Sequence, residues 1–298
     1  MTETTKGFLA ILGTCVVWGL SGIYYKWLSH VPPIEVLAHR TVWSLVFFGA
    51  IILAQGRIGI LWRMLSGRSV LLVAVASVMI SLNWFVYIWS VTYGHVVEAS
   101  LGYFIFPLVA VALGAAVYRE RLGRAQALAV GLALIAVCYL TWGLGVAPWI
   151  ALTLALTMGV YGMVKKKIAF GSDITVTGEV ALLAPLALAW LAALHFGWGV
   201  PAESGAFGSD WTTSLLLMFS GVLTGGPLVL FAYGAQRVRL GTLGILFYVN
   251  PTLQFLVAVM LFGEPLTPYH LVAFPVIWAA LVIYSAASLR ASAQPARA

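Results

Sequence analysis

The chain has 298 residues, of which 62% are hydrophobic and only 8% are charged, and its formal net charge is +7. Soluble domains carry about 25% charged residues, so the composition excludes an ordinary soluble domain and predicts a polytopic membrane protein. In such a protein the excess of lysine and arginine marks cytoplasmic loops, and we expect no nucleic-acid partner.

Ten apolar segments approach the length of about 20 residues that crosses a bilayer, which predicts an all-α fold of ten transmembrane helices. The breaks between them are short and rich in glycine, proline, serine and aspartate, and they leave no room for a soluble domain. In chain order the predicted spans are 7–29, 33–54, 70–93, 96–117, 124–142, 148–164, 174–197, 212–236, 240–262 and 268–289.

Charge placement predicts the orientation of these spans. Of the 16 lysines and arginines, all but Lys26 and Arg40 fall on one side of the predicted bundle. The positive-inside rule makes this side cytoplasmic and places both termini there. The opposite side carries the carboxylates Glu35, Glu98, Glu203, Asp210 and Glu264.

The sequence repeats itself at an offset of about 144 residues. Matching pairs are Glu35 and Glu179, Tyr87 and Phe231, Pro107 and Pro251, and Glu120 and Glu264. This pattern predicts two halves of five helices, residues 1–144 and 145–298. Because five is odd, the halves enter the membrane in opposite directions, an arrangement typical of alternating-access transporters with a site between the repeats. The alternative is a duplication retained only for packing.

Ionisable side chains inside a bilayer cost about 2.5–3.5 kcal/mol each on insertion scales and need a partner or a wet cavity. We expect Arg40 to receive a substrate carboxylate and Glu98 to receive an amine or a proton. A gate or proton-coupling role is assigned to Lys26, Glu35, His39 and His95. The open alternative is an ion pair from Arg40 to Glu98 or Glu35 that closes the gate without touching substrate.

Aromatic and amide side chains form a second candidate set, because binding pockets combine apolar walls with a few polar groups. Asn83 and Tyr87 share a helix face at i,i+4 spacing. The predicted substrate-binding aromatics and amides are Trp18, Asn83, Trp84, Tyr87, Tyr103, Tyr161, Phe231, Tyr248 and Asn250. Ordinary helix packing remains the alternative for each of them.

Pro107 and Pro251 each remove a helix hydrogen bond, and their mirrored positions predict hinges; static kinks are the alternative. Glu120 and Glu264 end equivalent helices at opposite faces and are expected to organise loops or gates. Cys15 and Cys138 have no metal spacing, and the chain has no Walker loop, HExxH or CxxC motif. We therefore expect no cofactor, no metal and no ATP hydrolysis.

Several motifs resemble the RarD-type members of the EamA branch of the drug/metabolite transporter superfamily. The most specific is Gly94-His95-x-x-Glu98-Ala-Ser100-Leu-Gly102-Tyr103-Phe104-x-x-Pro107-Leu108. Further matches are Glu35-Val-Leu-Ala-His39-Arg40, Asn83-Trp84, Glu120-Arg121-Leu122, Asn250-Pro251-Thr252 and Phe262-Gly263-Glu264-Pro265. The resemblance implies a multi-pass exporter of the inner membrane, for drugs such as chloramphenicol-like compounds or for amino acids. Phe106 departs from the asparagine expected there, whereas Asn250 keeps the amide.

The leading hypothesis is a secondary transporter, not an enzyme, that exports small amphipathic zwitterions or drugs. We expect the lipid bilayer and a small-molecule substrate as partners, protons as a possible coupling ion, and a monomer or weak dimer. Two alternatives are a membrane enzyme that uses the histidines and glutamates as acid–base groups or metal ligands, and a channel-like permease.

Overall fold

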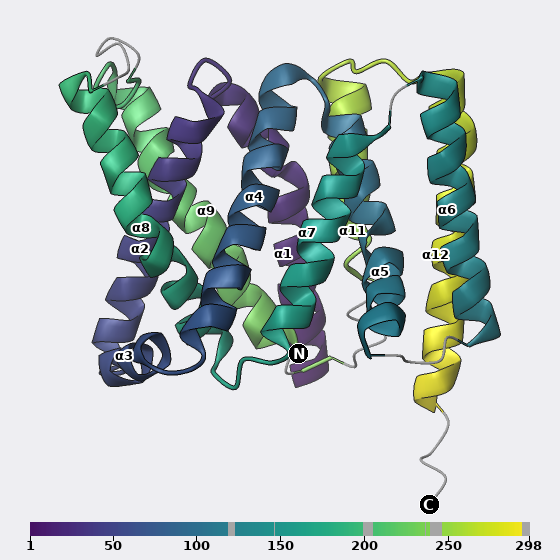
Figure 1. Cartoon of the computed structure of the whole chain (residues 1–298), viewed down its shortest axis with the longest axis horizontal. Helices are drawn as coiled ribbons and strands as arrows, with labels where there is room; N and C mark the ends of the chain where they lie inside the picture. Colours follow the sequence, from purple (N-terminus) through teal and green to yellow (C-terminus); the bar gives the residue numbers. More distant parts are fainter. Residues whose placement is uncertain (119–122, 146, 199–204, 236, 239–245, 294–298) are drawn as a thin grey trace, which may run out of the picture.

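The computed structural model is a bundle of helices (Figure 1), and it describes residues 1–118, 123–145, 147–198, 205–235, 237–238 and 246–293. Within these ranges the helices are α1 (Glu3–Trp27), α2 (Pro33–Ala54), α3 (Ile58–Ser66), α4 (Val70–Tyr93), α5 (Val96–Tyr118), α6 (Arg124–Leu144), α7 (Trp149–Lys165), α8 (Ser172–Phe196), α9 (Trp211–Ala235), α11 (Val249–Leu256), the π-helical turn η2 (Val257–Leu261) and α12 (Pro268–Ala293). Glu120 and Glu203, singled out from the sequence, lie outside the described residues.

Eight of these helices are long and apolar enough to cross a membrane, and two shorter apolar helices, Trp149–Lys165 and Val249–Leu261, accompany them. All ten predicted segments therefore contain helix, although the start of the ninth falls in the segment 239–245, which the structure does not describe. The helix α3 was not predicted from the sequence. Its nine residues span only about 14 Å, too short to cross a bilayer, and it lies at the end of the bundle that holds both termini (Figure 1).

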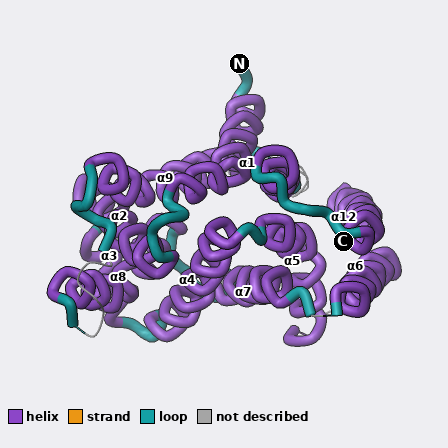
Figure 2. Tube along the Cα trace, turned by 90° about the horizontal axis from the view of Figure 1, so that it is seen from above, coloured by secondary structure: helices purple, strands orange, loops and turns teal. Residues whose placement is uncertain are grey.

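We call the end with both termini the basal end and the opposite end the distal end (Figure 1). Neighbouring helices come from far apart in the chain: α1 packs on α9 and α11, whereas α7 packs on α4 and α5. The helix α2 lies against α8 and α9. The view from above shows α6 and α12 paired at one end of the elongated cross-section and α2, α3 and α8 at the other (Figure 2).

Glycine permits two of these crossings to be close. A Cβ at Gly19 would lie 2.7 Å from the Leu253 Cβ on α11, and one at Gly102 would lie 2.8 Å from the Ala151 carbonyl oxygen on α7. A side chain at either position would separate the helices, because protein interiors are close-packed.

A glycine ends one helix and an aspartate caps the start of another at the distal end. Gly94, with φ of 74°, terminates α4 in the left-handed conformation that favours glycine. The carboxylate of Asp210 accepts a hydrogen bond from the backbone N–H of Thr213 at 2.8 Å and so caps α9. This backbone N–H holds the pKa of Asp210 below its ordinary value, since it stabilises the charged form.

The two prolines predicted as hinges occupy different local structures. Pro107 lies inside the continuous helix α5. The second case departs from the expectation of a mid-helix proline: the chain leaves helical structure at Phe247 and Tyr248, and Pro251 falls in the first turn of α11. The first N–H groups of a helix have no intrahelical partner, so proline costs no helix hydrogen bond there.

Candidate functional site

Arg40 lies inside the bundle, about 10 Å along α2 from its first residue, and is only 7% exposed. Its Nη1 donates to the hydroxyl of Tyr25 at 2.5 Å, and its guanidinium lies 4.1 Å from the centroid of the Trp84 ring. The Nε atom is buried and without a partner. No carboxylate in the described residues forms an ion pair with Arg40, so the ion pair to Glu35 or Glu98 that was the alternative to substrate binding is not formed.

Three phenols continue from Arg40 toward the centre of the bundle. The rings of Tyr25 and Tyr87 meet edge to face with centroids 6.1 Å apart, and those of Tyr87 and Tyr103 do so at 5.9 Å. The Tyr87 hydroxyl also lies 3.4 Å from Ser21 Oγ. The cation on α2 is thus joined to a wall of aromatic rings from α1, α4 and α5, each with a polar tip.

Asn83 connects this wall to α7. The Tyr103 hydroxyl donates to its Oδ1 at 2.8 Å, and its Nδ2 donates to the Leu154 carbonyl oxygen and to Thr157 Oγ1, both at 3.0 Å. We define the Arg40 site as Tyr25, Arg40, Asn83, Trp84, Tyr87 and Tyr103. Five of these residues were predicted from the sequence.

Tyr25 and Thr157 were missed. Tyr25 follows Gly22 at i+3 on the face that packs against α4, which was the available signal. Thr157 carries no such signal, since threonine is common in apolar helices.

The remaining predicted aromatics and amide lie elsewhere. Phe247 contacts both Trp18 and Phe231, with ring centroids 6.2 Å and 5.4 Å away. Asn250 accepts a hydrogen bond from Gln254 Nε2 at 3.1 Å, and Tyr248 is half-buried just before α11. Among the described residues, no ring contact or side-chain hydrogen bond joins these side chains to the Arg40 site, so the predicted substrate-binding residues divide into at least two groups.

The distal charges do not form one cluster either. His95 Nδ1 lies 3.4 Å from Glu98 Oε1, and the His95 ring stacks on Trp89. Lys26 places its Nζ 5.4 Å from the Phe262 ring centroid. Glu98 is therefore engaged in the turn that starts α5, away from Arg40.

Glu35 and His39 form a separate pair on α2. One oxygen of Glu35 accepts from the backbone N–H groups of Ala206 and Phe207 at 2.8 Å and 3.2 Å. The ring of His39 stacks on Phe207 with centroids 4.6 Å apart. In the described residues, no three His, Cys, Asp or Glu side chains are grouped as a metal site would require.

Another carboxylate, that of Glu264, accepts backbone hydrogen bonds at the distal end. Glu264 accepts from the backbone N–H groups of Val96 and Val97, at 2.8 Å and 2.7 Å, and so caps α5. A carboxylate at a helix N-terminus is stabilised by both the N–H groups and the helix dipole. The expectation that Glu264 organises a loop fits this geometry.

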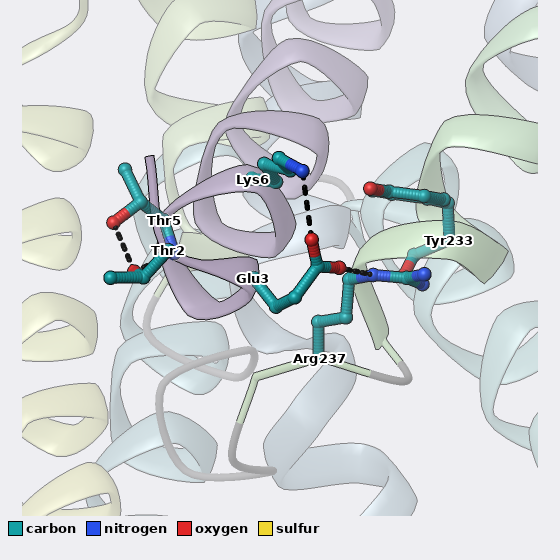
Figure 3. A network of polar contacts seen from close by, with 6 residues as sticks. All are labelled: Thr2, Glu3, Thr5, Lys6, Tyr233 and Arg237. Carbon is teal, nitrogen blue, oxygen red and sulfur yellow. Dashed lines mark hydrogen bonds and ion pairs between the residues drawn. The ribbon is translucent and has the colours of Figure 1, made fainter.

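Ion pairs at the surface lie at the basal end (Figure 3). Glu3 accepts from Lys6 at 2.8 Å and from Arg237 at 2.9 Å, and the Arg237 guanidinium lies 3.7 Å from the Tyr233 ring centroid. The backbone oxygen of Tyr233 also accepts from Arg237. These contacts join the start of α1 to the end of α9.

Comparison with known proteins agrees with this architecture. A model of the EamA-like transporter family matches residues 5–142. Protein RarD of Streptomyces exfoliatus is 42% identical over 289 residues, which cover 97% of this chain and 90% of that protein. Uncharacterized transporter YojE of Bacillus subtilis is 40% identical, with 95% and 94% coverage.

The chain therefore belongs to the EamA-like transporter family, in which it is a RarD-type member of the drug/metabolite transporters. It is a multi-pass membrane transporter. One solved crystal structure shares the fold, with a TM-score of 0.59 at 21% identity, and the match covers 94% of this chain and 96% of that one.

Proposed function

We propose that this transporter exports small amphipathic zwitterions, such as amino acids with an apolar side chain, by alternating access. The observation that carries the proposal is Arg40, a buried cation whose described partners are a phenol and an indole ring and not an anion. A substrate carboxylate would supply the missing charge, and the neighbouring rings would receive its apolar part.

The helix contacts support the proposed pair of inverted repeats. If α1, α4 and α5 correspond to α7, α9 and α11, the packing of α7 on α4 and α5 mirrors the packing of α1 on α9 and α11. The contact between α2 and α8 and that between α6 and α12 would each join equivalent helices. Such exchange of helices between halves favours a site at their interface.

The positive-inside rule supports a cytoplasmic basal end, and thus cytoplasmic termini in an inner membrane. The segments at this end carry Arg57, Lys166 and Lys167 between the long helices and Arg63 on α3. On this orientation the Arg40 site lies in the distal half, toward the exit. We keep protons as the coupling ion, and a monomer or weak dimer, as proposals.

The proposal is tested by counterflow of radiolabelled L-phenylalanine in proteoliposomes. This probe has a carboxylate for Arg40 and a ring for Trp84. We expect Arg40→Ala to reduce the initial rate at least about 30-fold, because an ion pair with a buried arginine contributes about 2 kcal/mol or more. Arg40→Lys should also lose most of the activity, since lysine cannot reproduce the planar bidentate contact.

Arg63→Lys is the matched control, because Arg63 is exposed on α3. It should transport like the wild type. Normal counterflow by Arg40→Ala, with Arg40→Lys and the control equally active, would remove the carboxylate assignment. Size-exclusion profiles of the purified variants separate loss of binding from loss of folded protein.

A further inference from the structure

The Glu35 carboxylate is buried but only half satisfied. It is 1% exposed, and its Oε1 accepts the two backbone N–H groups of Ala206 and Phe207. Its other oxygen, Oε2, is buried without a partner. A polar atom left unbonded in a membrane protein costs several kcal/mol, so this oxygen calls for water or a proton.

His39 repeats the pattern one turn further along α2. Its side chain is 5% exposed beneath the Phe207 ring, and neither ring nitrogen has a partner. Residues at i and i+4 share a helix face with Cβ atoms about 5–6 Å apart. One more turn along, the indole N–H of Trp43 is also buried and unpartnered.

In the described residues, the helices α4, α8 and α9, which pack on α2, supply no charged group that pairs with this face. The α8 helix packs on α2, but its Asp173 and Glu179 are paired with Arg57 and Lys165. Its His195 is exposed, and α9 and α4 contain no Asp, Glu, Lys, Arg or His.

In the neighbouring loops, His30 is the titratable group whose charge acts on the Glu35 carboxylate, and its Nε2 is hydrogen-bonded to Thr213. Asp210 accepts from the backbone N–H of Thr213. Arg40 lies about 100° around the helix from His39 and contacts Tyr25 and Trp84 instead.

We propose that Glu35 and His39 form a hydrated proton-binding site that is separate from the Arg40 site. A proton from water at the distal face binds Glu35 Oε2 or a His39 ring nitrogen and leaves to water by the same route. Both sites belong to α2, on different faces, and this shared helix is the structural link between proton binding and transport. The coupling to transport rests on the proposed function, whereas proton binding does not.

Proton binding is measured without substrate by infrared difference spectroscopy of the purified protein between about pH 4 and pH 9. This range spans the ordinary pKa values of glutamate and histidine. We expect a carboxyl band that disappears in Glu35→Gln and changes position in His39→Gln. In the control Glu3→Gln, which removes an exposed carboxylate, this band should persist.

An identical difference spectrum for wild type and Glu35→Gln would overturn the site. So would loss of the band on addition of sodium chloride at constant pH, because that result would identify a sodium site. Neither outcome depends on knowing the substrate.

Coupling is measured with L-phenylalanine in proteoliposomes under an imposed pH gradient. Glu35→Gln and His39→Gln should keep counterflow but lose gradient-driven accumulation at least about tenfold. Accumulation equal to wild type in both variants would exclude coupling through this pair. If the wild type shows no L-phenylalanine counterflow, the proposed function fails for this probe, while the infrared measurement still decides the proton site.

Discussion

Glu35 and Glu179 occupy equivalent positions in the repeated sequence but have different surroundings. Glu179 accepts from Lys165 Nζ at 2.7 Å and from the Tyr161 hydroxyl at 3.2 Å, so both of its oxygens are satisfied by side chains of its own half. Glu35 binds only backbone N–H groups of the other half and keeps one oxygen unpartnered. Both oxygens of the basal carboxylate thus have partners, whereas the distal carboxylate has one oxygen without a partner.

The cations follow the same division. The alignment that pairs Lys26 with Lys166 places Tyr25 opposite Lys165. Tyr25 is thus a phenol at the position where Lys165, its counterpart, is the lysine of an ion pair. The cation near Tyr25 is instead Arg40, at a position equivalent to Ala184. Because the cation is separate from the carboxylate, neither is neutralised by the other, which is what the proposed transport of zwitterions and protons requires.

The largest expected effect comes from breaking the closed pair. Glu179→Ala leaves the amine of Lys165 without its carboxylate, which for a buried ion pair costs about 3–5 kcal/mol in the free energy of unfolding. Glu35→Ala should cost less, about 1–3 kcal/mol, because it abandons only two backbone N–H groups. Denaturant titration in detergent measures both.

A double variant tests whether the loss of stability in Glu179→Ala comes from the unpaired charge of Lys165. Lys165→Met combined with Glu179→Ala should recover much of the loss, since no unpaired charge remains. If Glu35→Ala destabilised the protein more than Glu179→Ala, the assignment of an open and a closed end would be reversed.

An intermediate effect on the free energy of unfolding is expected at Glu264, which caps α5 at the distal end. Glu264→Gln retains a carbonyl oxygen but removes the charge that accepts from Val96 and Val97, and should cost about 1–2 kcal/mol. Hydrogen exchange at these two amides should accelerate. Glu98→Gln, which changes a carboxylate of the same turn that pairs with His95, is the comparison. Equal exchange in the two variants would contradict the capping role.

The smallest effect is expected at the exposed basal pair. Glu3 contacts Lys6 and Arg237 at the surface (Figure 3), where ion pairs contribute little to stability. Glu3→Gln should leave the unfolding midpoint unchanged within error. A clear decrease would mean that the junction of α1 and α9 stabilises the basal end more than its exposure suggests.

Much of the candidate site could be predicted because its residues are exceptional in their context. Polar and ionisable side chains are rare inside apolar helices, because the bilayer excludes such groups unless they have a role. The arginine, the asparagine and the Glu–His pair are therefore recognisable from the sequence. What could not be predicted was their pairing. Glu98 was expected near Arg40 but bonds to His95, and Tyr161 was expected at the substrate site but bonds to Glu179.

The sequence by itself determined that this chain is a helical membrane protein and where its long apolar helices lie, because hydrophobic length and charge placement are properties of consecutive residues. Only the tertiary structure decided that Arg40 meets Tyr25 and Trp84, that Glu35 reaches the 206–207 backbone and that Glu264 caps α5. These contacts depend on which helices are neighbours and how each is rotated. Apolar periodicity is too weak to define either in helices that face lipid on one side and protein on the other.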